Sequence, residues 1–98
     1  MPKGYWVTIY RKIHDPAKLA AYAELAPKAT APFGGKYLAR ATASMAYEAG
    51  LKDRIVISEF PSVEKAREAY ESAGYKNALK ALGDGADRDI RIVEGIAT

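Results

Sequence analysis

The order of its strand-like and helical segments is the feature that most constrains how this chain can fold. Large aliphatic and β-branched residues gather in short stretches typical of strands, and apolar residues recur at helical spacing between them. The strand-like stretches are residues 5–12, 36–43, 54–60 and 89–95, and the helical ones are residues 14–29, 61–72 and 73–82. This order predicts an α+β, ferredoxin-like βαββαβ subunit, with a four-stranded antiparallel sheet and the helices on one face.

Local signals at the segment ends support this division. Asp15 and Ser62 stand at helix starts, where their side chains can accept hydrogen bonds from free backbone N–H groups. Pro27 lies late in the first helix and is expected to kink or end it, because proline removes a hydrogen bond. Gly34 and Gly35 precede the second strand, where we expect a structural turn that uses positive φ angles.

Length and composition exclude several classes of protein. A chain of 98 residues forms one domain, residues 1–98, and its net charge of +3 comes from interleaved signs that do not favour a nucleic-acid or membrane partner. The absence of cysteine excludes thiolate chemistry, and a single histidine leaves little material for a metal site. We therefore expect neither a metal nor a cofactor. The sequence has no signal-peptide-like or membrane-spanning stretch, so the expected location is cytoplasmic.

The predicted sheet has more apolar surface than its helices can cover. Alternate residues of a strand point to opposite faces, and the helices cover only one face. A face that meets water should be polar, so an apolar second face indicates an interface. A second copy of the chain, packed sheet to sheet, is the simplest partner and predicts a homodimer. The predicted dimer interface, or its alternate positions if the register is reversed, consists of Trp6, Thr8, Tyr10, Val56 and Phe60.

Single-stranded RNA is the alternative partner for such a face. RNA-recognition domains share this topology and stack bases on aromatic residues of the open sheet. Their third strand carries a basic residue, a glycine and several aromatic residues, whereas residues 54–60 contain one aromatic residue and no glycine. The mild net charge also disfavours RNA.

Three residues could carry chemistry in the cleft between the sheet and the helices. His14 lies where the first strand meets the first helix and could act as a base near neutral pH, or be an exposed loop histidine. Arg40 and Glu59 become neighbours on adjacent strands if residues 44–53 close a hairpin. We expect them to form an ion pair, which is either structural or a pocket edge that presents the guanidinium to an anionic or carbonyl ligand.

The chain also has seven tyrosines, a large number for its length. Some could line a cavity with their polar tips, although each could equally be a core tyrosine with a satisfied hydroxyl. No arrangement of nucleophile, histidine and acid is visible, and neither is a pair of catalytic carboxylates. The candidate ligand-binding residues are Tyr22, Tyr37, Arg40, Glu59, Tyr70 and Tyr75.

The stretches KGYWV, APFGGKYLAR, IVISEFPSVEKAREAYES and RIVEG together resemble the DUF1330 family of small bacterial proteins, from about residue 3 to residue 95. The resemblance implies a dimeric α+β barrel and no settled activity. Family members commonly have two glycines where this chain has Ala41 and Thr42, and often a basic residue near Leu82, so an anion-binding role could be altered here. The residues carried over by resemblance are Gly34, Gly35, Arg40, Glu59, Phe60, Pro61, Tyr70 and Tyr75.

These observations predict a homodimer that binds a small organic or anionic molecule in the sheet–helix cleft. Dimeric barrels similar to this family include cofactor-free monooxygenases and isomerases of aromatic or polyketide-like compounds, so an enzyme is one reading. A binding or structural dimer without turnover is the other. The sequence does not separate these two readings.

Overall fold

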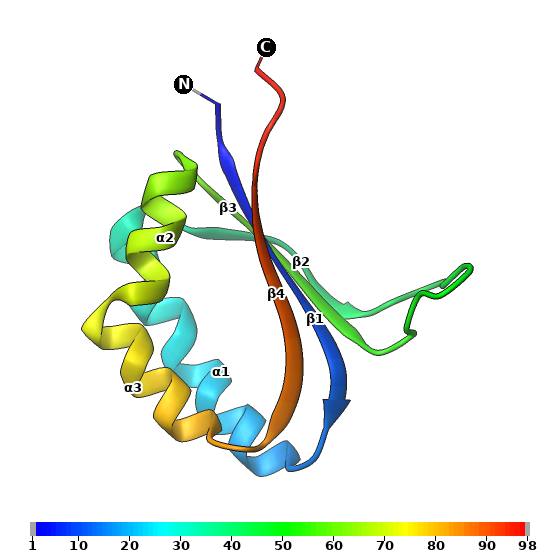
Figure 1. Ribbon diagram of the computed structural model, residues 1–98. Coiled ribbons are helices and arrows are strands. Elements are labelled where there is room, and N and C mark those ends of the chain that lie inside the picture. Colours follow the sequence, from blue (N-terminus) through cyan, green and yellow to red (C-terminus); the bar gives the residue numbers. More distant parts are fainter. Residues whose placement is uncertain (1, 98) are drawn as a thin grey trace.

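The computed structural model describes residues 2–97, and its elements follow the predicted order. All neighbouring strands are antiparallel, in the order β2-β3-β1-β4, and the helices lie together on one side of the sheet (Figure 1). The elements are β1 (Gly4–Ile13), α1 (Pro16–Thr30), a 3₁₀ turn (Ala31–Phe33), β2 (Lys36–Thr42), β3 (Arg54–Phe60), α2 (Val63–Glu71), α3 (Ala73–Leu82) and β4 (Ala86–Glu94). This topology confirms the ferredoxin-like prediction.

The helix ends follow the predicted signals. The side chains of Asp15 and Ser62 accept hydrogen bonds from backbone N–H groups in the first turns of α1 and α2. Pro27 does not end α1 at once, because the helix continues for three more residues to Thr30. The last turn still closes because the backbone N–H of Ala31 donates to the carbonyl oxygen of Pro27.

The two glycines before β2 serve different purposes. Gly34 has a φ of 83°, in the left-handed region, as predicted. Gly35 is not among the positive-φ residues, so the prediction was wrong for it. A Cβ at Gly35 would lie 2.6 Å from the ring of Phe60, which is fully buried. Glycine is required there for close packing of the chain against the core.

The core between sheet and helices combines small helical residues with large residues of the sheet. The buried helical positions include Ala26, Ala66 and Ala78. Opposite them lie Trp6 and Phe60, whose rings stack with centroids 5.9 Å apart. Helices with alanine faces leave volume that only large partners can fill, because protein interiors are packed without voids. This packing decides which face of the sheet the helices cover.

The predicted dimer interface therefore lies on the wrong face. Trp6, Thr8, Tyr10 and Phe60 are at most 5% exposed and lie beneath the helices, and Val56 lines the cleft beside them. The sequence alternation was read correctly, but the two faces were exchanged. The physical reason is that the rings of Trp6, Tyr10 and Phe60 fill the space above the helical alanines. The aliphatic side chains of the opposite face are too small to fill it.

The opposite face of the sheet is free of helices (Figure 1). The register pairs Val7 with Ile57 and Ile9 with Ile55, so the two central strands present an aliphatic strip there. These residues are half-buried in the single chain. Tyr5 is the one aromatic residue of β1 and β3 on this face, and therefore no multi-ring surface for stacking RNA bases exists on these two described strands.

Candidate functional site

A narrow cleft runs between the sheet and helix α1. It has about 480 Å³ of empty space, part of which is open to solvent. Small polar groups of Thr8, Ser58 and Thr30 interrupt its walls. The aromatic residues that line it are Trp6, Tyr10, Tyr22, Tyr37 and Tyr75, and the charged residues are Arg40 and Arg54.

A β-bulge directs Arg40 toward the cleft. Tyr37 pairs with Ser58 and Arg40 with Val56, and the register shifts between Tyr37 and Ala39. Two residues three positions apart normally lie on opposite faces, but the extra residue in the bulge places both on the cleft side. The guanidinium carbon of Arg40 lies 4.5 Å from the centroid of the Tyr37 ring. Arg40 therefore forms part of the cleft, as the sequence analysis expected.

The expected Arg40–Glu59 ion pair is absent from the described structure, and that prediction was wrong. Glu59 pairs in register with Tyr5 and so faces the opposite side of the sheet. Its carboxylate contacts Lys36 Nζ at 3.3 Å and accepts a hydrogen bond from Tyr5 Oη at 3.2 Å. Burial opposes its charge, but these hydrogen bonds outweigh the burial and lower the pKa of Glu59. Glu59 is thus outside the cleft.

His14 also lies away from the cleft. Its Nε2 atom is 2.9 Å from Asp87 Oδ2, and the side chain is exposed. Together with Lys18 and Asp84 it borders a shallow surface hollow at the start of α1. His14 is therefore not part of the cleft, and the alternative of an exposed loop histidine agrees with its position.

The candidate tyrosines divide into two groups. Tyr22, Tyr37 and Tyr75 line the cleft. Tyr70 does not line it and instead packs against Trp6 and Tyr75, with ring centroids 5.5 and 5.1 Å away. Tyr70 supports the wall from behind and is not itself part of the cleft lining.

Arg88 is a residue of the site that the sequence analysis missed. Its Nη1 donates to Tyr22 Oη at 2.9 Å, and its guanidinium carbon lies 4.7 Å from the Tyr22 ring centroid and 5.7 Å from that of Tyr10. Burial alone would lower the pKa of Arg88, but the tyrosine hydroxyls beside it outweigh burial and raise it. A signal was present, because Arg88 is in phase with Ile90 and Ile92 on the buried side of β4.

The hydroxyls of Tyr22 and Tyr75 form the inner end of this network. Their oxygen atoms lie 2.5 Å apart, and the two rings meet edge to face. Burial raises the pKa of Tyr75 far above its ordinary value. Tyr75 therefore stays protonated and can act as a neutral hydrogen-bond donor at physiological pH.

The cleft carries positive charge without a matching carboxylate. Among residues 2–97, Arg40 and Arg54 line it, Arg88 lies directly behind Tyr22, and no aspartate or glutamate is present in the lining. The described residues contain no group of three or more metal-ligating His, Cys, Asp or Glu side chains. No helix within the described range is long and apolar enough to cross a membrane.

Solved structures with this fold come from several bacteria. A protein of unknown function from Rhodopseudomonas palustris covers 99% of this chain and 85% of its own, at 16% identity and a TM-score of 0.76. SnoaB, a cofactor-independent oxygenase from Streptomyces nogalater, covers 100% and 97%, at 14% identity and a TM-score of 0.69. A dimeric ferredoxin-like protein of unknown function from Thermobifida fusca covers 95% and 91%, at 14% identity and a TM-score of 0.61. At these identities the similarity concerns the fold alone.

The sequence itself gives a more specific result. No curated protein matches it. Residues 3–96 match the domain of unknown function DUF1330, in agreement with the resemblance drawn from the glycine pair and the Glu-Phe-Pro-Ser stretch. Since this match spans nearly the whole sequence, the chain belongs to the DUF1330 family.

Proposed function

We propose that the protein binds a flat, anionic aromatic molecule in the sheet–helix cleft. The observation that carries this proposal is the lining itself, which combines five aromatic rings with two arginines and, within the described chain, no carboxylate. Arg40 is exposed at the cleft and Arg54 is half-buried, and neither has an acid partner among the described residues, so both guanidinium groups are free to pair with a ligand. An anionic ligand would supply the missing partner, and its ring would stack on the aromatic walls.

The walls of the cleft support a planar ligand. Five of its fourteen lining residues are aromatic, so the walls present flat ring surfaces. An aromatic ligand can stack on these rings, whereas a bulky aliphatic molecule cannot. We therefore propose a one- or two-ring compound with an ionised oxygen.

Binding is favoured over acid–base catalysis by the groups that are available. The described lining contains no histidine, aspartate or glutamate that could remove a proton. Burial raises the pKa of Tyr75 and of Tyr37, so their hydroxyls stay protonated at neutral pH and are poor bases. The likeness to an oxygenase concerns the fold, and turnover is therefore not part of the proposal.

The single tryptophan of the chain provides a direct test. Trp6 lines the cleft, so quenching of its fluorescence by a nitroaromatic dye reports occupancy of this site. The wild type should bind para-nitrophenolate more tightly than neutral nitrobenzene. The double variant Arg40→Gln/Arg54→Gln should lose that preference, while the control variant Arg67→Gln, on the exposed surface of α2, should retain it. Equal affinity of the wild type for the charged and neutral dyes would overturn the proposal.

We also propose that the protein is a homodimer through the open face of the sheet. The aliphatic strip formed by Val7, Ile9, Ile55 and Ile57 supports this, because an apolar face of this kind on a four-stranded sheet is rarely left to water. The connection between β2 and β3 extends beyond the sheet (Figure 1) and adds exposed apolar side chains that a second subunit could cover. The fold similarity to a dimeric ferredoxin-like protein agrees with this arrangement.

Light scattering of paired variants tests the dimer. Ile57→Asp places a carboxylate in the centre of the proposed interface and should give monomers or insoluble protein. Leu25→Asp makes the same kind of change at an exposed position of α1, on the other side of the molecule, and should remain dimeric. A wild type that is monomeric at all concentrations would contradict the proposed dimer.

A further inference from the structure

The hydroxyls of Tyr22 and Tyr75 carry two hydrogen atoms, and the hydrogen bond between them uses only one. Tyr22 Oη and Tyr75 Oη lie 2.5 Å apart, so one of the two O–H groups donates to the other. Tyr22 Oη also accepts from Arg88, which occupies a lone pair and no hydroxyl hydrogen. Within residues 2–97 neither hydroxyl has another protein acceptor. One hydroxyl hydrogen of the pair is therefore left without an acceptor in the described protein.

The spare hydrogen lies where a molecule bound in the cleft can accept it. Both tyrosines line the cleft, and Tyr75 is 1% exposed, so its surroundings are largely dry. A buried O–H group without an acceptor is unfavourable, and an acceptor atom on a bound molecule would remove that cost. The hydrogen bond from the Arg88 guanidinium polarises Tyr22 and makes the linked hydroxyls stronger donors.

We infer that the Tyr22–Tyr75 pair, held and polarised by Arg88, donates this hydrogen to the ionised oxygen of a phenolate or enolate ligand. The inference rests on the proposed function and narrows its ligand class. A single hydrogen matches a single charged oxygen, whereas a carboxylate spreads its charge over two oxygens and suits the fork of an arginine. The tyrosine pair therefore selects phenolates over carboxylates of the same size.

Tyrosine-to-phenylalanine variants test this assignment because the pair is redundant. In Tyr75→Phe the hydrogen of Tyr22 is free to donate, and in Tyr22→Phe that of Tyr75 is free, so each single variant keeps one donor and should bind para-nitrophenolate within a few-fold of the wild type. The double variant has no donor and should lose about tenfold or more. Its affinity for para-nitrobenzoate, measured by the same quenching of Trp6, should change little.

The absorption spectrum of the bound dye gives a second readout that a structural role would not change. The wild type should lower the pKa of bound para-nitrophenol by stabilising its anion. Tyr75→Phe, which keeps the donor that Arg88 polarises, should lower it more than Tyr22→Phe, which loses that contact. This comparison uses single variants only, and it holds even if the double variant does not fold.

The outcomes separate the inference from the function on which it rests. Equal loss of para-nitrophenolate and para-nitrobenzoate binding in the double variant, or a full loss in each single variant, would overturn the assignment and leave the anion-binding cleft standing. Equal dye pKa values in the two single variants would do the same. A wild type that binds neither dye would overturn both proposals.

Discussion

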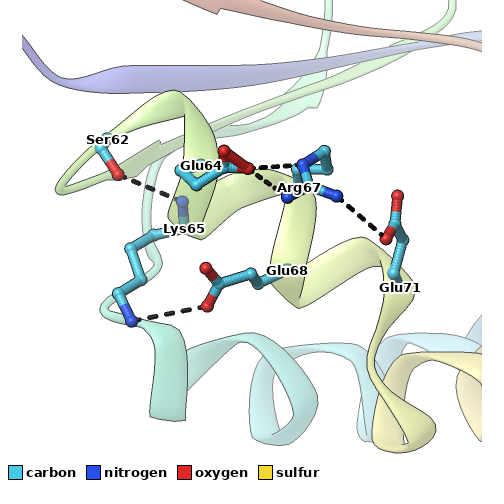
Figure 2. Close-up of polar contacts among 6 residues, drawn as sticks. All are labelled: Ser62, Glu64, Lys65, Arg67, Glu68 and Glu71. Carbon is cyan, nitrogen blue, oxygen red and sulfur yellow. Dashed lines mark hydrogen bonds and ion pairs between the residues drawn. The ribbon is translucent and has the colours of Figure 1, made fainter.

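Arg67 on helix α2 and Arg88 beneath helix α1 show two ways in which this protein places an arginine. Figure 2 shows Arg67 between Glu64 and Glu71 on the surface of α2, where Nε donates to Glu64 at 2.6 Å and Nη1 donates to Glu71 at 3.3 Å. Arg88 has no carboxylate partner among the described residues. It donates to the hydroxyl of Tyr22 and lies over two aromatic rings.

The charge of Arg67 is neutralised by its partners, whereas the charge of Arg88 is not. The partners of Arg67 are exposed, follow the helical i+3 and i+4 spacing, and cancel its charge in water, where such pairs contribute little to stability. The partners of Arg88 are neutral phenols, so the cleft keeps a net positive field in surroundings of low polarity. The comparison supports the proposal that the arginines of the cleft serve a ligand, whereas Arg67 serves only the surface of α2.

Among the variants that test this comparison, the largest loss of stability is expected for a substitution of Trp6. This side chain forms the floor of the cleft and packs against Phe60, Tyr70 and Tyr75. Trp6→Ala should lower the free energy of unfolding by about 3–5 kcal/mol, measured by urea denaturation, because it leaves a cavity in the core. A loss below about 1 kcal/mol would mean that the aromatic cluster is loosely packed and that the cleft has no fixed shape.

Arg88→Met should separate binding from stability. Methionine keeps much of the side-chain volume and removes a half-buried charge that has no acid partner among the described residues, so the free energy of unfolding should change by less than about 1 kcal/mol or increase. Affinity for para-nitrophenolate should nevertheless fall about tenfold or more. If the variant unfolds instead, Arg88 is a structural residue and its contrast with Arg67 is lost.

Ser62 tests how the helix that carries Arg67 is held. Its Oγ accepts a hydrogen bond from the backbone N–H of Lys65 at 3.1 Å and caps α2 (Figure 2). Ser62→Ala should lower the free energy of unfolding by about 1 kcal/mol, visible as a shift of the urea midpoint. Dye affinity should stay at the wild-type value, and a parallel loss of affinity would show that α2 also shapes the cleft.

The smallest effect is expected for Arg67→Gln. Both ion pairs of Arg67 are exposed, so thermal unfolding at moderate salt should be unchanged within error. A clear destabilisation that persists at high salt would show that surface arginines also matter for stability, and the proposed contrast between the two regions would then fail.

The periodicity of the sequence was sufficient to predict the fold, because alternation and helical spacing are local properties that the tertiary structure kept. The same alternation could not decide which face of β1 the helices cover, since Trp6–Tyr10 and Val7–Ile9 are both apolar sets. That choice depends on the fit of large rings above helical alanines, which is a non-local property of packing.

The site was predicted in part, for similar reasons. Tyr22, Tyr37, Tyr75 and Arg40 do line the cleft. The expected link to Glu59 fails because β2 pairs Arg40 with Val56, away from Glu59 along β3, and the bulge in β2 turns Arg40 to the other face of the sheet. No local signal marked that bulge, because it follows from how β2 and β3 pair. Arg88 was overlooked because the fourth strand was predicted to begin at residue 89, whereas β4 begins at Ala86.

A crystal structure of the protein with para-nitrophenolate would test the central claim most directly. We predict that the ring lies between Trp6, Tyr10 and Tyr37, with its ionised oxygen within hydrogen-bonding distance of the hydroxyl of Tyr22 or Tyr75. A dye bound in the surface hollow beside His14, or bound in the cleft with its oxygen turned away from both tyrosines, would contradict the claim that the charge of this cleft serves an anionic aromatic ligand.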